Sequence, residues 1–219
     1  MSSPRSPRVI VLGAGAAGLC VSIKLLEAGV DDLTILEKSD GVGGTWRANT
    51  YPGAACDVPS HLYSFSFAPK KDWTRKFAQQ PEILSYFEDV TDRYDLRHRI
   101  RFGTEATSAR FDEDAGEWHV TIADGTSLTA DVLISGLGQL NRPFTPEIDG
   151  LAEFGGDVFH SARWDHDIDL AGRRVGVIGN GASTVQFLPP TAEVAGHLTL
   201  FQRSANWILP KPDREFSPL

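Results

Sequence analysis

The stretch RVIVLGAGAAG, from Arg8 to Gly18, decides the fold. Its run of β-branched and apolar residues is typical of a buried strand, and the residues from Ala16 to Ala28 are predicted to form a helix. Between them stand Gly13, Gly15 and Gly18, in the order Gly-x-Gly-x-x-Gly. The first glycine permits a tight turn, the second lets a pyrophosphate approach the backbone, and the third lets helix and strand pack closely. The sequence therefore predicts a dinucleotide site at the start of the helix.

An acidic residue stands where such a site needs one. Glu37 closes a second apolar strand, LTIL, 24 residues after Gly13. A carboxylate at that place accepts hydrogen bonds from the ribose hydroxyls of an adenine nucleotide. The alternative is an ordinary glycine-rich turn, which the strand, helix and acid together make much weaker. Up to Glu37 the pattern does not distinguish FAD from NAD.

The same unit occurs twice. RVGVIGNGAST, Arg174 to Thr184, repeats the first stretch at an offset of 166 residues. LTLFQRS, Leu198 to Ser204, repeats LTILEKS, Leu33 to Ser39, at an offset of 165. We expect a second helix from Ala182 to about Val194 and a second pair of parallel strands. The predicted fold class is α/β, with two Rossmann-like dinucleotide-binding units.

The residues between the two copies predict a helix and an antiparallel insertion. Gln80 to about Tyr94 has Pro81 in its first turn and apolar residues at helical spacing. The alternating runs EATSARF, EWHVTI and SLTADVLIS predict an antiparallel β-meander leading into a return strand at Val132 to Ser135. NRPFTPEIDG, at 141–150, has two prolines and little periodicity. We therefore expect one dinucleotide-binding domain over 1–145 and a second over 146–219.

The composition of the chain argues against several other classes of protein. Lys and Arg total 21 against 29 Asp and Glu, a net charge of -8 without a long basic run, which argues against nucleic acid as a partner. Cys20 and Cys56 stand 36 positions apart, so neither a disulfide framework nor a zinc site is predicted. Reduced thiols fit a cytoplasmic location best. The apolar run near the start is short and broken by glycine, so we expect no targeting segment and no membrane span.

The second glycine turn departs from the first in two ways. Gly179 and Gly181 recreate the phosphate-binding turn, but Thr184 replaces the third glycine and is expected to push the helix away from the strand. Gln202 stands in the place of Glu37 and is followed by Arg203 and Ser204. A guanidinium and a hydroxyl suit a 2'-phosphate, so NADPH is preferred over NADH. The alternative is a surface arginine at a strand end.

A loop rich in glycine and aromatic residues follows Glu37. It contains GVGGTW (Gly41 to Trp46) and YPGAACDVPSHLYSFSF (Tyr51 to Phe67). Gly43 and Gly44 let backbone lie close to a flat ligand, and Trp46, Tyr51 and Tyr63 offer stacking surface, although each aromatic could equally belong to the core. GGTW, YPGAACDV and SHLYSFSF, in this order and spacing, resemble the flavin-binding stretch of class B flavoprotein monooxygenases, most closely the Baeyer-Villiger branch.

A second stretch carries the same resemblance. Phe154, Gly156, His160, Trp164 and Asp165 match the Baeyer-Villiger fingerprint F-x-G-x-x-x-H-x-x-x-W-[P or D] at every defined position. The related flavin monooxygenases that oxidise amines and sulfides are similar only part way, so Trp164-Asp165 favours the ketone-oxidising branch. A histidine in such a place is more often a hydrogen-bonded structural residue than a catalyst. In the family it is similarly described as coupling the two domains.

The resemblance implies an activity. NADPH would reduce FAD, and one oxygen atom from O2 would be inserted next to the carbonyl of a small-molecule ketone, giving an ester or lactone. Asp57 and His160 are the catalytic candidates, and Asp57 matches the family aspartate beside the flavin that positions an arginine, although a carboxylate there is also an ordinary loop cap. The expected FAD contacts are Gly13, Gly15, Ala17, Gly18, Glu37, Lys38, Gly44, Thr45, Trp46, Asp57, Tyr63 and Ala106. The expected NADPH contacts are Gly179, Asn180, Gly181, Ala182, Ser183, Thr184, Arg203 and Ser204.

The resemblance implies that the domain over 1–145 binds FAD, and that 146–219 form the N-terminal part of an NADPH-binding domain that is truncated at its C-terminal end. Family chains run to roughly twice this length or more, on the scale of several domains, so the matching arginine is expected beyond Leu219 and Asp57 is expected to lack a partner. We expect the isolated chain to be unstable and to form no ester. Two alternatives remain: an incomplete FAD- and NADP-binding fragment, and an N- or S-oxygenating monooxygenase. A disulfide-reductase-like enzyme needs a redox cysteine pair, which Cys20 and Cys56 do not resemble.

Overall fold

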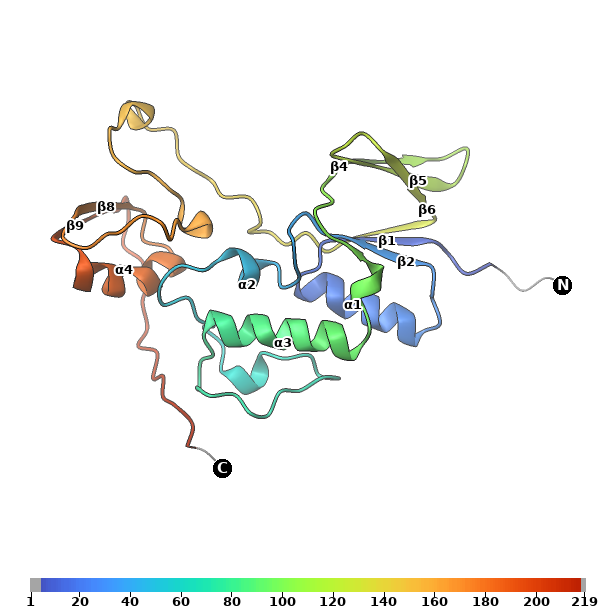
Figure 1. Ribbon diagram of the computed structural model, residues 1–219, viewed down its shortest axis with the longest axis horizontal. Coiled ribbons are helices and arrows are strands. Elements are labelled where there is room, and N and C mark those ends of the chain that lie inside the picture. Colours follow the sequence, from blue (N-terminus) through green and yellow to red (C-terminus); the bar gives the residue numbers. More distant parts are fainter. Residues whose placement is uncertain (1–4, 218–219) are drawn as a thin grey trace. The chain divides into compact units, whose positions relative to one another are not determined.

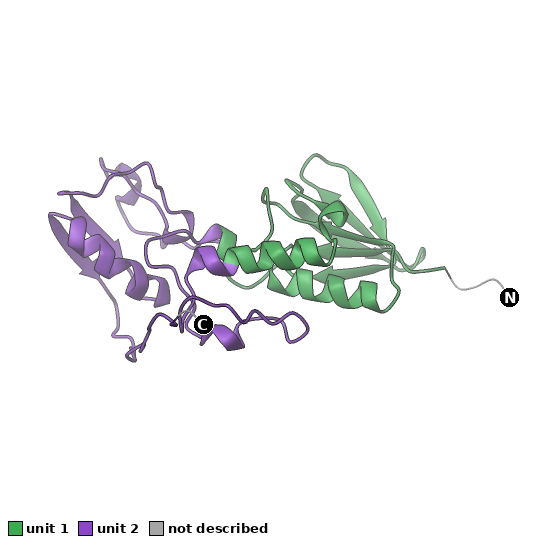
Figure 2. Ribbon diagram, turned by 60° about the horizontal axis from the view of Figure 1, so that its bottom comes forward, with its two compact units in different colours: residues 1–47, 84–141 green, residues 48–83, 142–219 purple. Residues whose placement is uncertain are grey.

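The computed structural model describes residues 5–217, which form two compact units (Figure 2). Unit 1 comprises Met1–Arg47 and Leu84–Asn141, and unit 2 comprises Ala48–Ile83 and Arg142–Leu219. The first four and last two residues of the predicted domains lie outside the described part. Unit 2 includes a stretch from the first half of the sequence, so the units are not consecutive along the chain. The division into domains at residue 145 stays a prediction.

A parallel sheet forms the core of unit 1, in the strand order β3-β2-β1-β7; Figure 1 labels two of its strands, β1 and β2. Its strands are β1 (Val9–Leu12), β2 (Leu33–Leu36), β3 (Ile100–Arg101) and β7 (Val132–Ser135). β1 is central and buried along its whole length, with Val9 opposite Leu33 on one side and Val132 on the other. A strand that is buried on both faces has a continuous run of apolar residues in its sequence. The sequence prediction of a buried parallel strand is therefore confirmed.

Unit 1 also contains one whole long helix and most of a second one. α1 (Ala16–Glu27) starts at the predicted residue and ends one residue before the predicted end. It buries Leu19 and Ile23 and contacts β1 and β2. α3 (Gln80–Arg93) carries Glu82 in its first turn and Arg93 in its last, as the helix dipole favours. Its apolar residues at helical spacing, Ile83, Phe87 and Val90, are buried.

The predicted antiparallel meander is present in unit 1. β4 (Ala106–Asp112), β5 (Glu117–Ile122) and β6 (Ser127–Ala130) form one sheet in that order. Val120 and Ala130 are buried against residues of the parallel sheet, in a cluster with Ile10, Leu12 and Leu36. The insertion therefore shares its core with the first glycine-turn unit.

Unit 2 contains the second copy of the repeat. β8 (Arg174–Ile178) and β9 (His197–Phe201) pair in parallel, with Arg174 opposite His197, and α4 (Ala182–Val194) joins them. The bounds of α4 agree with the sequence prediction. Val177 packs in a buried cluster with Tyr51, Ala54 and Phe187, joined by Trp164. α4 therefore covers one face of the strand pair, and Tyr51 and Ala54 pack into the same cluster.

Short helices complete both units: α2 (Thr45–Ala48), η1 (Ser60–Leu62), η2 (Arg97–Arg99), η3 (Leu151–Glu153) and η4 (Ser161–Arg163). Among residues 5–217, no helix is both long enough and apolar enough to span a bilayer. The predicted glycine- and aromatic-rich loop over 41–67 contains η1 and also α2, where Thr45 to Ala48 turn helically. There the amide N–H of Trp46 bonds to the carbonyl of Gly43 at 3.1 Å.

Candidate functional site

The first glycine turn is closed by contacts that leave no room for side chains at Gly13 and Gly18. Gly13 has φ +94°, and a Cβ there would lie 2.9 Å from the carbonyl oxygen of Gly136. A Cβ on Gly18 would lie only 1.8 Å from the carbonyl oxygen of Gly13. The bend and the close approach of helix to strand therefore both require glycine, as the spacing predicted.

The second glycine of this turn, Gly15, faces a second stretch of glycine backbone. Gly15 caps the N-terminus of α1, and a Cβ on it would lie 3.5 Å from Cα of Gly44. The N–H of Gly43 donates to the carbonyl of Ala14 at 3.0 Å. No acidic side chain occupies the first turn of α1. A backbone cradle thus forms at a helix N-terminus, the arrangement that accommodates a pyrophosphate.

Glu37 holds this turn from inside the unit. The side chain is buried, and Oε2 accepts a hydrogen bond from the backbone N–H of Ala14 at 2.7 Å. Oε1 accepts from the N–H and the hydroxyl of Ser39, at 2.8 and 2.7 Å. A carboxylate has about four acceptor positions, so one remains for a ribose hydroxyl. The hydrogen bond between Glu37 and a ribose stays a prediction. No sequence pattern pointed to the hydrogen bond between Glu37 and the N–H of Ala14.

The residues expected to contact FAD belong to both units. Gly13, Gly15, Ala17, Gly18, Glu37, Lys38, Gly44, Thr45, Trp46 and Ala106 belong to unit 1, whereas Asp57 and Tyr63 belong to unit 2. Ala106 starts β4 and packs against the shared core. Trp46 and Tyr63 are half-buried. Tyr51 is buried in an edge-to-face contact with Phe187, at 5.9 Å between ring centroids, so its alternative interpretation as a core residue holds.

The second glycine turn is more open than the first. Gly179 has φ +100°, yet a Cβ on Gly179 or Gly181 would meet no atom within 4 Å. Thr184, which aligns with Gly18, is buried. Its side chain could not occupy the place that Gly18 takes in the first copy, since even a Cβ there collides with the turn. The expected displacement of α4 from β8 by Thr184 stays a prediction.

Amide side chains hold the second turn to the end of β9. Nδ2 of Asn180 donates to Oε1 of Gln202 at 3.1 Å and to the carbonyl of Ser204 at 2.7 Å. Nδ2 of Asn206 donates to the carbonyl of Asn180 at 2.6 Å. Gln202 therefore closes its turn much as Glu37 closes the first. Arg203 is exposed, and the structure shows no partner for its guanidinium within residues 5–217.

Asp57 has partners within the chain, so the expectation that it would lack one is wrong. Its Oδ1 accepts a hydrogen bond from Nε2 of Gln186 at 3.1 Å and lies 3.6 Å from Nζ of Lys211. The Asp57 side chain is 65% exposed. Both partners lie more than a hundred residues away in the sequence, on α4 and in the segment after β9. No spacing rule pointed to them.

His160 has a structural contact. It precedes η4 as its N-cap, and Nδ1 accepts a hydrogen bond from the N–H of Ala162 at 3.0 Å. Nδ1 is thus the acceptor, and Nε2 is the ring nitrogen left for other contacts. Trp164 of the same fingerprint packs at 5.2 Å from the Phe159 ring and 5.3 Å from the Phe187 ring. The fingerprint segment therefore packs against α4 through Trp164.

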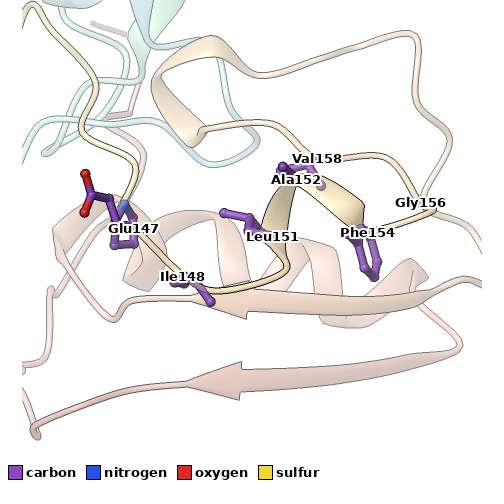
Figure 3. Close-up of a pocket in the computed structure, with 8 residues that line it drawn as sticks. Glu147, Ile148, Leu151, Ala152, Phe154, Gly156 and Val158 are labelled. Atoms are coloured by element: carbon purple, nitrogen blue, oxygen red, sulfur yellow. The ribbon is translucent and has the colours of Figure 1, made fainter.

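Other features of the described residues supply no chemistry. An open depression in unit 2 is lined by Pro146, Glu147, Ile148, Leu151, Ala152, Phe154, Gly156 and Val158 (Figure 3). Glu147 is its single titratable side chain. Within the part of the chain that the structure describes, no group of three metal-ligating side chains occurs. Burial raises the pKa of the Cys56 thiol, which weighs against a redox cysteine.

Comparisons with known proteins agree on one family. The model of the flavin-binding monooxygenase-like family matches residues 6–218. A Baeyer-Villiger monooxygenase of Pseudomonas aeruginosa is 49% identical over 216 residues, covering 99% of this chain and 41% of its own. One of Streptomyces coelicolor is 50% identical, covering 96% and 40%.

Solved structures that resemble the chain are also monooxygenases. An oxidized steroid monooxygenase bound to NADP has a TM-score of 0.88 and 45% identity, covering 98% of this chain and 42% of its own. A complex of OTEMO with FAD and NADP has a TM-score of 0.91 and 38% identity, covering 97% and 42%. The chain therefore spans about two fifths of the length of the relatives it matches.

Proposed function

The chain belongs to the flavin-binding monooxygenase-like family, and we propose that it binds FAD and NADPH for a Baeyer-Villiger oxidation. One oxygen atom of O2 is inserted next to the carbonyl of a small-molecule ketone, and the product is an ester or a lactone. The observation that carries the proposal is the doubled glycine turn. The first copy is closed by a buried acid, Glu37, and the second ends in the exposed Arg203.

The first turn fits FAD. Gly15 leaves space for a pyrophosphate at the N-terminus of α1, where backbone N–H groups and the helix dipole favour negative charge. Glu37 orients the adenosine ribose with the acceptor capacity that Ala14 and Ser39 leave unused. FAD, when bound, supplies the activation of O2 that protein side chains lack. A structural relative is a complex with FAD and NADP, which supports the assignment.

The second turn fits NADPH. Gly181 caps α4 with open space around it, and Arg203 is free to pair with a 2'-phosphate. A relative bound to NADP supports this site. Asp57 and His160 are the residues of this chain to which we assign roles near the reaction. Asp57 orients a positive charge beside the reacting oxygen, and His160 supports the segment that joins the nucleotide units.

Trp164-Asp165 and the names of the relatives favour ketones over amines and sulfides as substrates. Net acidic charge argues against nucleic acid as a partner. A cytoplasmic location, based on the two unpaired cysteines, stays a prediction.

The test has two steps. Visible flavin absorbance in the purified chain is expected first. NADPH-dependent oxygen uptake with cyclic and aryl ketones, and ester detected by mass spectrometry, are expected when these residues stand in a full-length enzyme, whereas the isolated chain is expected to form no ester. Flavin binding without oxygen uptake would favour the incomplete nucleotide-binding alternative. Oxidation of amines or sulfides in place of ketones would favour the N- or S-oxygenating alternative.

A further inference from the structure

Gln186 uses the full hydrogen-bonding capacity of its side chain on one short segment. Oε1 accepts from the hydroxyl of Tyr51 at 3.1 Å and from the N–H of Ala55 at 3.2 Å. Nε2 donates to the carbonyl of Ala55 at 2.9 Å and to Oδ1 of Asp57 at 3.1 Å. An amide has two donor hydrogens and two acceptor lone pairs. All four point to the residues between Tyr51 and Asp57.

A second contact brings the same segment against the backbone of α4. Gly53 has φ +80°, and a Cβ on it would lie 2.7 Å from the carbonyl oxygen of Gln186. Pro190 lies inside α4 and has no N–H, so the helix supplies no i+4 donor to this carbonyl. The unbonded carbonyl and the missing side chain together permit the close approach. Only glycine fits at this point.

Apolar packing adds to these polar contacts. Tyr51 and Ala54 are buried with Phe187, the residue after Gln186. On the far side of Asp57, Nζ of Lys211 donates to the carbonyl of Cys56 at 3.3 Å and lies 5.4 Å from the centre of the Phe77 ring. Asp57 is therefore held by an amide and an ammonium, whereas the main chain around it is fixed to α4.

We propose that Gln186 is a positioning residue for Asp57, and that it makes the segment 51–57 move as one body with the helix that follows the second glycine turn. This inference rests on the proposed function, which places Asp57 near the reaction and a nucleotide at Gly179 and Gly181. Because α4 begins at that turn, occupancy of the nucleotide site is transmitted along α4 and reaches the Asp57 carboxylate through the side chain of Gln186. The family resemblance assigns no such role to Gln186.

Amide hydrogen exchange of Ala55 measures the contact directly, because its N–H donates to Gln186. Gln186→Leu removes the amide and keeps a similar volume, and exchange at Ala55 should accelerate about five- to tenfold, as the loss of one hydrogen bond predicts. Glu193→Ala, on the exposed face of the same helix, should leave Ala55 unchanged. Protection of the amides of β8 and β9, which lie in the same unit as Gln186, shows that each variant is folded. Unchanged protection of Ala55 in a folded Gln186→Leu variant would overturn the proposal.

Gln186→Glu separates positioning from simple packing. At neutral pH the new carboxylate can still accept from the N–H of Ala55, but it has no hydrogen for the Ala55 carbonyl or for Asp57 and repels both of these oxygens. The segment should therefore be displaced from the helix, and protection of Ala55 should fall. Below about pH 4, near the usual pKa of glutamate, the protonated acid regains a donor and protection should return. A variant whose Ala55 protection, corrected for the intrinsic pH dependence of exchange, does not change with pH would contradict the assigned role.

A final measurement tests the coupling. NADP+ added to the unmodified chain should raise the protection of Ala55, and it should not do so in Gln186→Leu. Calorimetry reports binding separately: an absence of NADP+ binding contradicts the proposed function, while the nucleotide-free exchange data still decide the role of Gln186. Binding without added protection at Ala55 would overturn the coupling.

Discussion

Oε2 of Glu37 lies 2.7 Å from the backbone nitrogen of Ala14, so the acid at the end of the second strand fixes the peptide inside the first glycine turn. One carboxylate thus prepares the turn and remains available to a ribose. Preparing the turn before the ligand arrives lowers the ordering cost of binding. The same relationship makes the stability of unit 1 sensitive to Glu37.

Changing Glu37 to Leu removes the acceptor for Ala14 and Ser39. Leaving buried donors without partners typically costs about 1–3 kcal/mol each, so the free energy of unfolding should fall by at least that amount. Urea unfolding followed by circular dichroism measures it. Glu147→Leu, at an exposed position outside the turn, is the control. Equal stability of the two variants would contradict the role of Glu37.

Two glycine substitutions should distinguish loss of the space for a ligand from loss of the packing between helix and strand. Gly15→Ala places a Cβ at an ordinary 3.5 Å from Gly44 but inside the space proposed for pyrophosphate. The variant should fold normally and lose FAD, as flavin fluorescence and absorbance will report. Gly18→Ala brings a Cβ to 1.8 Å from the Gly13 carbonyl and should disrupt the turn itself. Normal flavin retention by Gly15→Ala would refute the cofactor assignment.

Arg203→Ala should reduce the preference for NADPH over NADH. Loss of a charge-assisted pair to a phosphate costs roughly 1.5–3 kcal/mol, or about ten- to a hundredfold in discrimination. Affinity for both nucleotides is measured by calorimetry, with Arg142→Ala as the control because Arg142 is also exposed. A preference that stays the same in Arg203→Ala means that another group reads the 2'-phosphate.

The ion pair between Asp131 and Arg8 should make stability depend on pH. Hydrogen bonds from Arg8, chiefly, and its charge hold the pKa of Asp131 well below its ordinary value. A lowered pKa in the folded state stabilises the protein above the unfolded pKa, about 3.9 for aspartate, and this stabilisation is lost as the pH falls further. Asp131→Asn should therefore be less stable than the unmodified chain at pH 7, and the difference should shrink below about pH 4. Asp167→Asn, at an exposed site, should show no such trend in urea unfolding.

The repeat made the two strand-turn-helix-strand units predictable, because local patterns determine them. The start of α1 at Ala16 and both ends of α4 follow from glycine turns and apolar periodicity. The meander followed from alternation between short polar turns. These features need no knowledge of contacts between distant residues.

Contacts between distant residues were not predictable from the same patterns. Gln186 and Asp57 are 129 positions apart, and neither shows a local signal for the other. Likewise, the residues 48–83 pack with the second repeat even though they follow the first. Apolar residues such as Tyr51 indicate burial without indicating which helix they meet. Their partner, Phe187, becomes visible only in three dimensions.

The strand pair of unit 2 has a practical consequence. Among residues 5–217, β8 and β9 pair with no other strand, so each presents one row of backbone N–H and C=O groups without a ladder partner. Ile178 and Phe201, at 55% and 56% exposed, add apolar surface at the same strand ends. Open edges of this kind template the addition of further strands. The chain in solution should accordingly self-associate as its concentration rises, and light scattering will show it before any loss of secondary structure.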